Sequence, residues 1–596
     1  MTSSPNVASR ELFRLFLIKP SHYDDDGYVI QWVQSEIPSN TMAVLNGIAL
    51  DCIERRVLGD NVDIEIIAQD ETNTRIKPKR IIRAIRECGS KGLVALVGVQ
   101  SNQFPRAMDI ARPLRAAGVP VCIGGFHVSG CMSMLPELPA DIREAQDLGI
   151  SVFAGEAEGR LDEVLQDAYG NKLKAVYNYM PDLPGMEGVP TPVLASPNIR
   201  RNIGKRTSFD SGRGCPFQCS FCTIINVQGR KSRYRSADDI ERILRENLDQ
   251  GVTSFFITDD NFARNRNWEA IFDRIIKFRN DENVDIKLII QVDTLCHSIP
   301  NFIKKAGQAG VNRVFIGLEN INPDNLMAAK KRQNRITEYR TMLQMWKATG
   351  AIVYCGYILG FPADTPDRIL RDIEILKREL PIDLIEFFCL TPLPGSEDHQ
   401  VLDAKKIWMD PDMNKYDLEH VCTGHPLMSP AEFQDIYNRA WDAFYTPEHV
   451  ETLMRRAVVN GMRPRRIMRV ALWFYACHAI EGVHPLQGGR FRRKYRLDRR
   501  PSFPVESVLT FYPRYLWEVF SKVARLLRLY RRFSRVCARV ERDPNKYAYT
   551  DLSLRPPEEE DLDELEIFTA TESGHSAVEK MRKQRARGAA KVSVAG

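Results

Sequence analysis

The stretch Ser211-Gly-Arg-Gly-Cys215-Pro-Phe-Gln-Cys219-Ser-Phe-Cys222 decides how this sequence is interpreted, because it places three thiols on one short glycine-containing loop. A four-iron, four-sulfur cluster normally has four cysteine ligands, so three ligands would leave one iron open to a small molecule. A structural zinc site needs four closely spaced ligands, and after Cys222 no cysteine or histidine follows until Cys296. We expect an iron–sulfur cluster on Cys215, Cys219 and Cys222, with zinc or plain buried cysteines as the alternatives.

A repeating strand–helix pattern follows this loop. Short apolar runs bounded by polar, Gly or Pro residues are typical of strands that are buried on both faces. The expected strands are residues 254–258, 286–292, 313–319, 353–360 and 384–390, with helix-like stretches between them. The alternation predicts a parallel sheet or barrel.

Acidic side chains lie just past the carboxyl ends of these strands. In parallel barrels the reactive site is built at that end, so these residues are site candidates. Each of them could equally be a solvated loop end or a helix cap. The candidates are Asp259, Asp260, Asp293 and Glu319.

The C-x3-C-x2-C spacing, with the aromatic Phe221 before the last cysteine, resembles the signature of the radical S-adenosylmethionine (SAM) superfamily. The resemblance implies that SAM binds the open iron and is cleaved by one electron to a 5′-deoxyadenosyl radical. It also implies a partial, TIM-like (β/α)6 barrel, and the five runs plus a strand leading into Cys215 make up that number. Phe221 would lie near the adenine.

Two further segments resemble SAM contacts of that family. Gly356-Tyr-Ile-Leu-Gly360 resembles the fifth-strand segment at the adenine, and Gly317-Leu-Glu319 resembles the fourth-strand contact. The family's Gly-Gly-Glu segment after the second strand is absent. Thr258-Asp-Asp-Asn-Phe262 stands in its place, which makes Asp260 the candidate there.

A second α/β unit precedes the cluster loop. Strands expected at 12–20, 62–67, 93–99, 119–125 and 152–155 alternate with helices, which predicts one doubly wound, Rossmann-like domain. The ligand of such a domain lies beyond the carboxyl ends of the strands. Three of those ends carry loops at 100–103, 124–129 and 155–159, whose glycines would let a phosphate or nucleotide tail approach the backbone closely.

The order of these loops resembles the cobalamin-binding domain that precedes the barrel in one branch of the radical SAM superfamily. The cobalt-ligating motif Asp-x-His-x-x-Gly is absent, so we expect His127 to be structural and the lower face of cobalt to be open or water-occupied. The resemblance implies cofactor contacts from Gln100, Ser101, Gly124, Gly125, His127, Gly155 and Glu156.

The sequence predicts five regions. We expect a cobalamin-binding domain at 1–177, a linker at 178–207, the radical SAM barrel at 208–400, an α-helical cap over the barrel mouth at 401–545 and a disordered tail at 546–596. Between Arg490 and Asp543 there are sixteen Lys/Arg against five Asp/Glu. Leu516, Phe520, Val523 and Leu527 lie there at helical spacing beside arginines, as in a helix at a membrane surface; a basic helix packed on the protein is the alternative that we favour slightly.

Composition is ordinary for a globular enzyme, with 27% charged and 44% hydrophobic residues in 596. Thirteen cysteines, scattered except for the triplet, argue against a disulfide framework and for a reducing compartment. The N-terminus lacks signal-peptide features, and no apolar window is long enough to span a bilayer. We therefore expect a cytoplasmic protein, with a peripheral contact at the inner face of the membrane left open. A net charge of +6 without a recognition module argues against a nucleic-acid partner.

The combined resemblance implies a cobalamin-dependent radical SAM enzyme, most plausibly a C-methyltransferase that acts on an unactivated carbon. The expected partners are a small-molecule substrate, with a lipid-like one left open, and a reducing electron donor such as flavodoxin or ferredoxin. Two alternatives remain: an enzyme of the same branch that rearranges rings or forms carbon–carbon bonds without methyl transfer, and a non-enzymatic iron–sulfur or corrinoid carrier.

Overall fold

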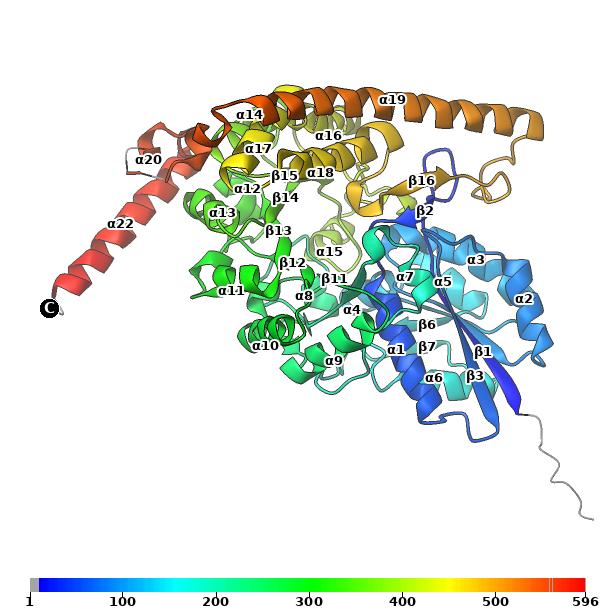
Figure 1. Ribbon diagram of the computed structural model, residues 1–596. Coiled ribbons are helices and arrows are strands. Elements are labelled where there is room, and N and C mark those ends of the chain that lie inside the picture. The colour runs from blue at the N-terminus through cyan, green and yellow to red at the C-terminus, as the bar shows by residue number, and fades with distance from the viewer. Residues whose placement is uncertain (1–9, 557, 560, 595–596) are drawn as a thin grey trace, which may run out of the picture.

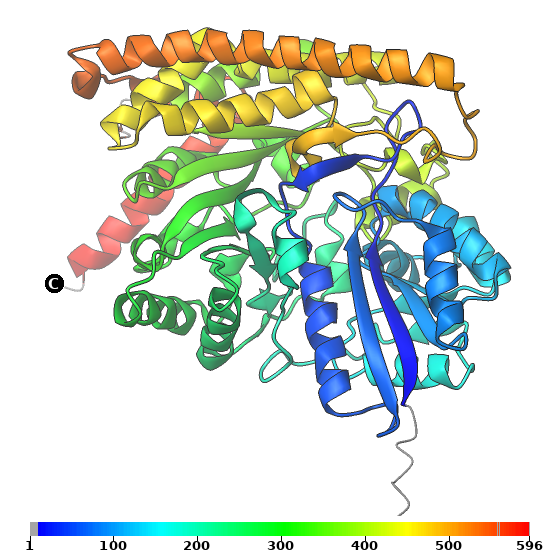
Figure 2. The ribbon, with the colours of Figure 1, turned by 45° about the vertical axis from the view of Figure 1, so that its right-hand side comes forward.

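Figure 1 shows a computed structural model, which describes residues 10–594 except 557 and 560. Two parallel sheets lie side by side, and a layer of C-terminal helices lies across one end of them (Figures 1 and 2). This mixed α/β architecture with a helical C-terminal region is the predicted fold class.

The N-terminal sheet has six parallel strands in the order β3-β1-β4-β5-β6-β7. Two separate apolar clusters cover its two faces, as a doubly wound domain requires. The strands are β1 (Glu11–Lys19), β3 (Val62–Asp70), β4 (Gly92–Leu96), β5 (Val121–Gly124), β6 (Ser151–Ala154) and β7 (Val176–Asn178). The helices are α1 (Asn40–Glu54), α2 (Pro78–Glu87), α3 (Phe104–Ala116), α4 (Phe126–Met134), α5 (Ala140–Asp147) and α6 (Leu161–Tyr169). The sequence missed β7 because three residues are too few to show a period.

The second sheet also has six strands, in sequential order β8-β11-β12-β13-β14-β15, and every neighbouring pair is parallel. The strands are β8 (Thr207–Phe209), β11 (Ser254–Ile257), β12 (Lys287–Val292), β13 (Val311–Glu319), β14 (Ile352–Leu359) and β15 (Leu384–Cys389). The outer helices include α9 (Ala237–Leu248), α10 (Trp268–Asp281), α11 (Phe302–Ala309), α13 (Tyr339–Lys347) and α14 (Pro366–Glu379). This is the expected partial barrel.

The helices after the barrel share its hydrophobic core. Along β15, the ring of Trp441 lies 5.5 Å from that of Phe387, and the Tyr445 hydroxyl donates a 2.8 Å hydrogen bond to the Ile385 carbonyl. These helices thus extend the barrel wall beside β15. They are α16 (Pro430–Phe444), α17 (Pro447–Val459), α18 (Pro464–Ala476) and α19 (Val508–Arg542).

The C-terminal stretch differs from its expected disorder. It contains α20 (Asp561–Glu564), α21 (Glu566–Thr569) and α22 (Glu572–Val594), and the side chains of Leu565 and Phe568 are buried in the barrel core. Disorder was predicted because the stretch is strongly charged. In the structure a few buried apolar side chains anchor it to the barrel.

A short antiparallel pair joins the two ends of the chain. Strand β2 (Gln31–Ser35) pairs with β16 (Gly489–Arg493), and Trp32 is buried beneath the pair. A Cβ at Gly489 would lie 2.1 Å from the Trp32 ring, so the close approach requires glycine. None of the helices in the described part of the chain is long and apolar enough to cross a membrane.

Candidate active site

The cysteine loop is closed at its base by two short antiparallel strands, β9 (Gly212–Arg213) and β10 (Arg233–Tyr234). Gly214 has a φ of +90°, and a Cβ there would lie 2.4 Å from the Lys231 carbonyl oxygen. Only glycine fits this turn, which starts the loop directly before the first cysteine.

The three thiols of the cysteine loop lie close enough for each to affect the pKa of its neighbours. Burial raises the pKa of Cys222 to about 12, and the neighbouring thiols of Cys219 and Cys215 contribute to the rise. The Gln333 amide donates a 3.4 Å hydrogen bond to the Cys219 sulfur. No three His, Cys, Asp or Glu side chains of the described residues are arranged to hold a single metal ion. Three thiols on one loop fit a cluster, which is larger than a single ion and binds thiolates.

Glu319 occupies a strained position at the carboxyl end of β13. Its φ is +63°, in the left-handed region that is uncommon for a residue with a side chain, and the pairing with β14 shifts register there. Its carboxylate forms a buried ion pair with Lys331, whose ammonium group also lies 5.6 Å from the centre of the Phe221 ring. The predicted fourth-strand contact and the predicted adenine neighbour are therefore linked through Lys331, which the sequence reasoning missed.

A cavity of about 300 Å³ lies beside the cluster loop at the ends of β14 and β15. Gly360 and Ser220, the neighbour of Phe221, both contribute to its wall. Gly360 has a φ of +99°, and a Cβ there would lie 2.2 Å from the Phe433 ring. At Gly356 a Cβ would lie 2.8 Å from the Phe315 ring. Both glycines are thus needed for close packing of aromatic side chains.

The acidic candidates take different roles. Asp259 accepts hydrogen bonds from the Ser211 amide and hydroxyl at 2.6 and 2.8 Å, and so fixes the chain just before the cysteine loop. Asp293 accepts two hydrogen bonds from Arg264, at 2.6 and 2.8 Å, which is a structural ion pair. Burial, with the Asp259 charge, raises the pKa of Asp260 to about 7. Of these three, Asp260 is the one whose side chain makes no hydrogen bond to the described residues.

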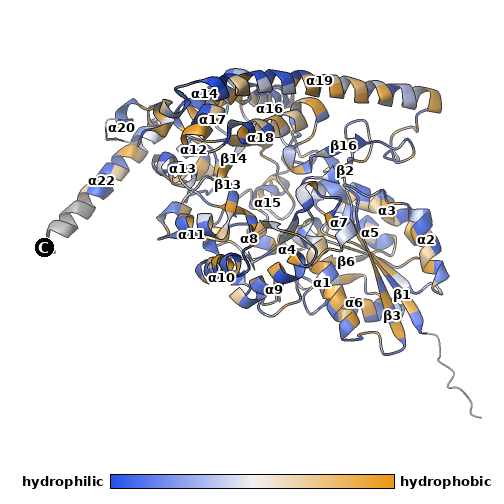
Figure 3. Cartoon of the chain, in the orientation of Figure 1, coloured by the Kyte–Doolittle hydropathy of each residue, from blue (hydrophilic) through white to orange (hydrophobic). Residues whose placement is uncertain are grey.

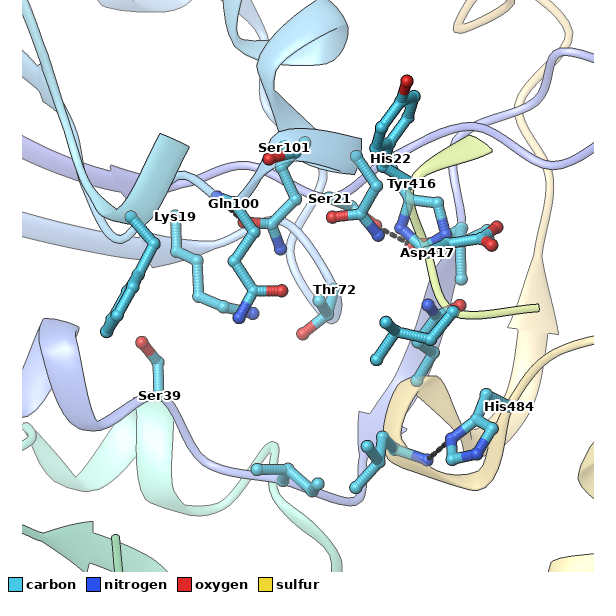
Figure 4. A pocket seen from close by; sticks show the side chains of 18 of the residues that line it. Lys19, Ser21, His22, Ser39, Thr72, Gln100, Ser101, Tyr416, Asp417 and His484 are labelled. Carbon is cyan, nitrogen blue, oxygen red and sulfur yellow. Dashed lines mark hydrogen bonds between the residues drawn. The ribbon is translucent and has the colours of Figure 1, made fainter. Parts of the chain in front are cut away.

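The loops of the N-terminal sheet surround two cavities. One, of about 180 Å³, is lined by Gly124, Gly125, Gly155 and Glu156. The other, of about 400 Å³, is lined by Gln100 and Ser101, together with residues from the barrel side of the molecule. Figure 4 shows Gln100, Lys19 and Ser39 facing this second cavity from one side and Asp417 and His484 on the other.

The glycines of these loops also pack closely on the protein's own backbone. A Cβ at Gly125 would lie 2.2 Å from the backbone nitrogen of Val99, and the approach of a nucleotide tail to these glycines stays a prediction. Gly125, with a φ of +150°, is required by the protein's own backbone. Gly155 is similar, since a Cβ there would lie 3.0 Å from the Tyr179 carbonyl carbon.

His127 lines neither cavity. It is buried, with Nδ1 3.1 Å from the Ser101 hydroxyl and Nε2 3.0 Å from the Asp141 carboxylate. Because both ring nitrogens are engaged, the imidazole positions the 100–103 loop and has no nitrogen left for cobalt.

A buried arginine joins the two halves of the site. Arg213, two residues before Cys215, contacts Asp210, Glu156 and Glu158 at 2.6 Å each. Despite the opposing effect of burial, these carboxylates raise the pKa of Arg213 well above its usual value. Sequence reasoning missed this role, although Arg213 stands in the quoted loop and Glu156 and Glu158 in a Gly-Glu-x-Glu segment.

Comparison with known proteins agrees with this geometry. Residues 210–376 match the radical SAM superfamily. The chain is 26% identical over 404 residues to bacteriochlorophyllide d C-8(2)-methyltransferase of Chlorobaculum tepidum, which covers 63% of this chain and 82% of that protein. It is 24% identical over 334 residues to hopanoid C-2 methylase of Rhodopseudomonas palustris, covering 54% and 61%. Among solved structures, the radical SAM methyltransferase TsrM of Kitasatospora setae, with cobalamin and a [4Fe-4S] cluster bound, superposes with a TM-score of 0.52 at 14% identity, covering 77% of this chain and 98% of TsrM.

The fold and the cysteine loop thus define a radical SAM enzyme. More narrowly, the chain is similar in sequence to bacteriochlorophyllide and hopanoid methylases and in fold to TsrM, which confirms the resemblance found in the sequence. The [4Fe-4S] cluster and SAM are its cofactors, and Cys215, Cys219 and Cys222 are the residues that fit the cluster. The contacts of the other predicted residues with SAM and cobalamin stay predictions.

Proposed function

We propose that this protein is a cobalamin-dependent radical SAM C-methyltransferase that acts on an unactivated carbon. The observation that carries the proposal is the 400 Å³ cavity between the two parallel sheets. Gln100 and Ser101 line it from the N-terminal domain, while Thr223 and Leu393 line it from the barrel side, Thr223 directly after Cys222. A substrate in this cavity would lie between a corrinoid on one sheet and a cluster on the other.

When bound, SAM and the cluster supply a radical that abstracts hydrogen, and cobalamin supplies the methyl group. The protein's own residues bind and orient these groups. In this proposal the three cysteines would hold the cluster, Asp260 would pair with the SAM amino group, and Glu319 with Lys331 would shape the fourth-strand contact. Arg213 fixes the distance between the two cofactor loops, which proximity-driven chemistry needs.

The test is the fate of SAM in anaerobically reconstituted protein. Methyl transfer consumes two SAM molecules per turnover, so 5′-deoxyadenosine and S-adenosylhomocysteine should rise together once uncoupled cleavage is subtracted, and only with the true substrate. Methylation would be contradicted if the substrate is consumed and 5′-deoxyadenosine forms, but no S-adenosylhomocysteine forms and no labelled methyl group passes from SAM to the product. That result would favour a ring rearrangement or carbon–carbon bond formation. Absence of SAM cleavage under all conditions would favour a carrier protein.

Reductive cleavage of SAM also requires an electron donor. We infer a small one-electron carrier such as flavodoxin or ferredoxin, because the cluster loop is partly exposed at Cys215 and Cys222. Deoxyadenosine formation should depend on that donor when no chemical reductant is present.

We further propose that α19 holds this cytoplasmic enzyme at the inner face of a membrane. The helix is 35 residues long, and its outward face carries large apolar side chains: Leu509 is 87% exposed, Trp517 74% and Phe520 68%. Leu509, Leu516, Phe520, Val523 and Leu527 follow one another at intervals of three, four and seven residues, so they lie on one face. The alternative of an apolar stripe packed on the protein does not fit these exposures.

The charge of α19 indicates an anionic lipid surface. Val508–Arg542 contains nine Lys/Arg against two Asp/Glu, and Arg528, Arg531, Arg532 and Arg535 have no ion-pair partner among the described residues. Figure 3 shows hydrophobic residues concentrated in the N-terminal half of the helix and hydrophilic ones in the other half. An apolar face with adjacent arginines is typical of helices that lie in the plane of the membrane interface.

A further inference from the structure

A fourth cavity, of about 100 Å³, lies inside the barrel. Inward-facing residues of β11 to β15 line it, and α18 closes it with Trp473 and Phe474. Phe315 on β13 and Tyr354 on β14 form part of its wall. Each lies two residues before a glycine, Gly317 or Gly356, of a segment that is predicted to contact SAM. Two residues of a strand span about 7 Å, so the cavity lies one step deeper in the barrel than these glycines.

This interior cavity adjoins the 400 Å³ cavity between the two sheets. Ile37, Pro38 and Leu486 line both of them. A molecule that lies between the cofactor loops could therefore extend one part of its structure into the barrel interior.

The walls of the interior cavity are mainly aromatic and aliphatic. The Tyr354 ring lies 5.3 Å from Phe315 and 6.0 Å from Phe474, which forms a continuous aromatic wall. Arg206 and Arg313 reach the cavity, but both are directed to Glu36, at 3.3 and 3.7 Å. Glu36 thus pairs with both arginines and offsets one of their two positive charges.

Glu386 on β15 is the exception in this apolar wall. Its side chain is 2% exposed, and Oε2 has no hydrogen-bond partner among the described residues. Burial raises the pKa of Glu386 to about 8, so the group carries a proton at neutral pH and can donate a hydrogen bond. A buried polar group without a partner costs about 1–3 kcal/mol, a cost without structural benefit here.

We propose that the barrel interior receives a mainly apolar part of the substrate and that Glu386 donates a hydrogen bond to an oxygen atom which this part carries. The inference rests on the proposed function for the identity of the reaction, and it deepens that function by naming the chemical class of the substrate. Glu386 acts in substrate selection, because a site that is built to hydrogen-bond one oxygen rejects molecules that lack it.

The test uses three variants of the full-length reconstituted enzyme. Glu386→Gln keeps a hydrogen-bond donor of the same size, Glu386→Leu removes it, and Leu384→Ile changes the same wall without touching a polar group. The probe is an organic-solvent extract of cells that make this protein. Binding is measured first, by mass spectrometry of compounds that stay with the protein after gel filtration. Turnover is then measured with SAM that carries a deuterated methyl group.

We expect an oxygen-containing, solvent-soluble compound to be retained by the wild type, Glu386→Gln and Leu384→Ile. Retention by Glu386→Leu should fall about tenfold to a hundredfold, the size expected when one buried oxygen loses its partner. The circular-dichroism spectrum and the unfolding temperature of each variant, compared with those of the wild type, show whether it folds. Full retention by Glu386→Leu, or loss in Glu386→Gln equal to that in Glu386→Leu, would overturn the inference. If compounds bind in this pattern but no deuterated methyl is transferred, the methyltransferase proposal fails and the substrate inference stands.

Discussion

The Nη1 atom of Arg213 lies 2.6 Å from Oε2 of Glu156, and this contact joins the cluster loop to the loop that follows β6. The Arg213 side chain is 9% exposed, and Glu156 contacts a second arginine, Arg233, at 2.5 Å. The two loops, which come from different domains, are therefore held together by one ionic network.

Replacing Arg213 should separate the two loops. Arg213→Met leaves three buried carboxylates without their shared cation, which typically costs about 3–5 kcal/mol. We expect a lower unfolding temperature and weaker cobalamin binding. Arg245→Met, which removes a surface arginine of α9, is the matched control and should change neither. Unaltered cobalamin affinity in Arg213→Met would show that the network only stabilises the fold.

Cys219→Ala should abolish the cluster. Wild-type protein, reconstituted anaerobically, should hold about four irons and four sulfides and cleave SAM after reduction. The variant should do neither, whereas Cys88→Ala, far from the loop in the N-terminal domain, should behave as wild type. Iron and sulfide analysis with a deoxyadenosine assay checks this, and SAM cleavage by Cys219→Ala would disprove the assignment.

Bound cobalamin should not have His127 on cobalt. Both nitrogens of His127 are already hydrogen-bonded to Ser101 and Asp141, so the paramagnetic resonance spectrum of the cobalt(II) form should lack nitrogen splitting from this histidine. His127→Ala should lower thermal stability and leave the spectrum unchanged. A splitting that disappears in His127→Ala would contradict this arrangement.

The exposed face of α19 should bind anionic vesicles. Sedimentation with vesicles of zwitterionic phospholipid, with or without phosphatidylglycerol, should show binding that rises with the anionic lipid and falls with salt. The double change Leu516→Glu and Phe520→Glu should reduce binding about tenfold or more, because it places charges in the apolar face. Leu427→Glu, at an exposed leucine in a loop, is the control. Equal binding by all three proteins would rule out α19 as the contact.

Asp372 on α14 should make stability depend on pH. Burial, followed by the Asp364 charge, raises its pKa to about 7. A carboxyl group with a raised pKa in the folded state favours folding below its unfolded pKa, near 4, and this contribution is lost as the pH rises to about 7.

The amide of Asp372→Asn does not titrate, so the variant should gain stability relative to wild type between pH 5 and pH 8, by about 2–4 kcal/mol. Denaturation midpoints at the two pH values measure this change. Asp367→Asn, at an exposed position of the same helix, should show no such gain. The prediction would be refuted if the difference in the free energy of unfolding between Asp372→Asn and wild type is the same at pH 5 and pH 8.

The regular parts of this fold were predictable from the sequence. Five of the six barrel strands and five of the six N-terminal strands were expected from short runs rich in apolar residues, whereas β8, Thr-Ser-Phe, was expected only as the strand that leads into Cys215. The cysteine loop was equally clear, since three thiols in eight residues have few other uses. Contacts between distant segments could not be predicted, because no local pattern records them. Arg213 with Glu156, Lys331 with Glu319 and the pairing of β2 with β16 are all of this kind.

Two misjudgements have physical causes. The amphipathic spacing of α19 was correct, but spacing alone does not tell whether an apolar stripe faces the protein or the solvent. Disorder was predicted for the region of α22 because of its high charge. The few apolar side chains that anchor it did not stand out in the sequence. The sequence could not show that Glu386 lacks a hydrogen-bond partner, because a single acidic residue in an apolar run does not reveal what its side chain contacts.

The pairing of β2 with β16 also sets an order of events during synthesis. Residues 31–35 leave the ribosome early, yet their partner strand, residues 489–493, emerges only when more than four-fifths of the chain has been made. Until then Trp32 lacks its cover, and the wall of the large cavity formed by His484 and Leu486 does not exist. Since the last barrel strand, β15, ends at Cys389, the space between the two domains stays open on this side while residues 390–488 are synthesised, and residues 489–493 then close it.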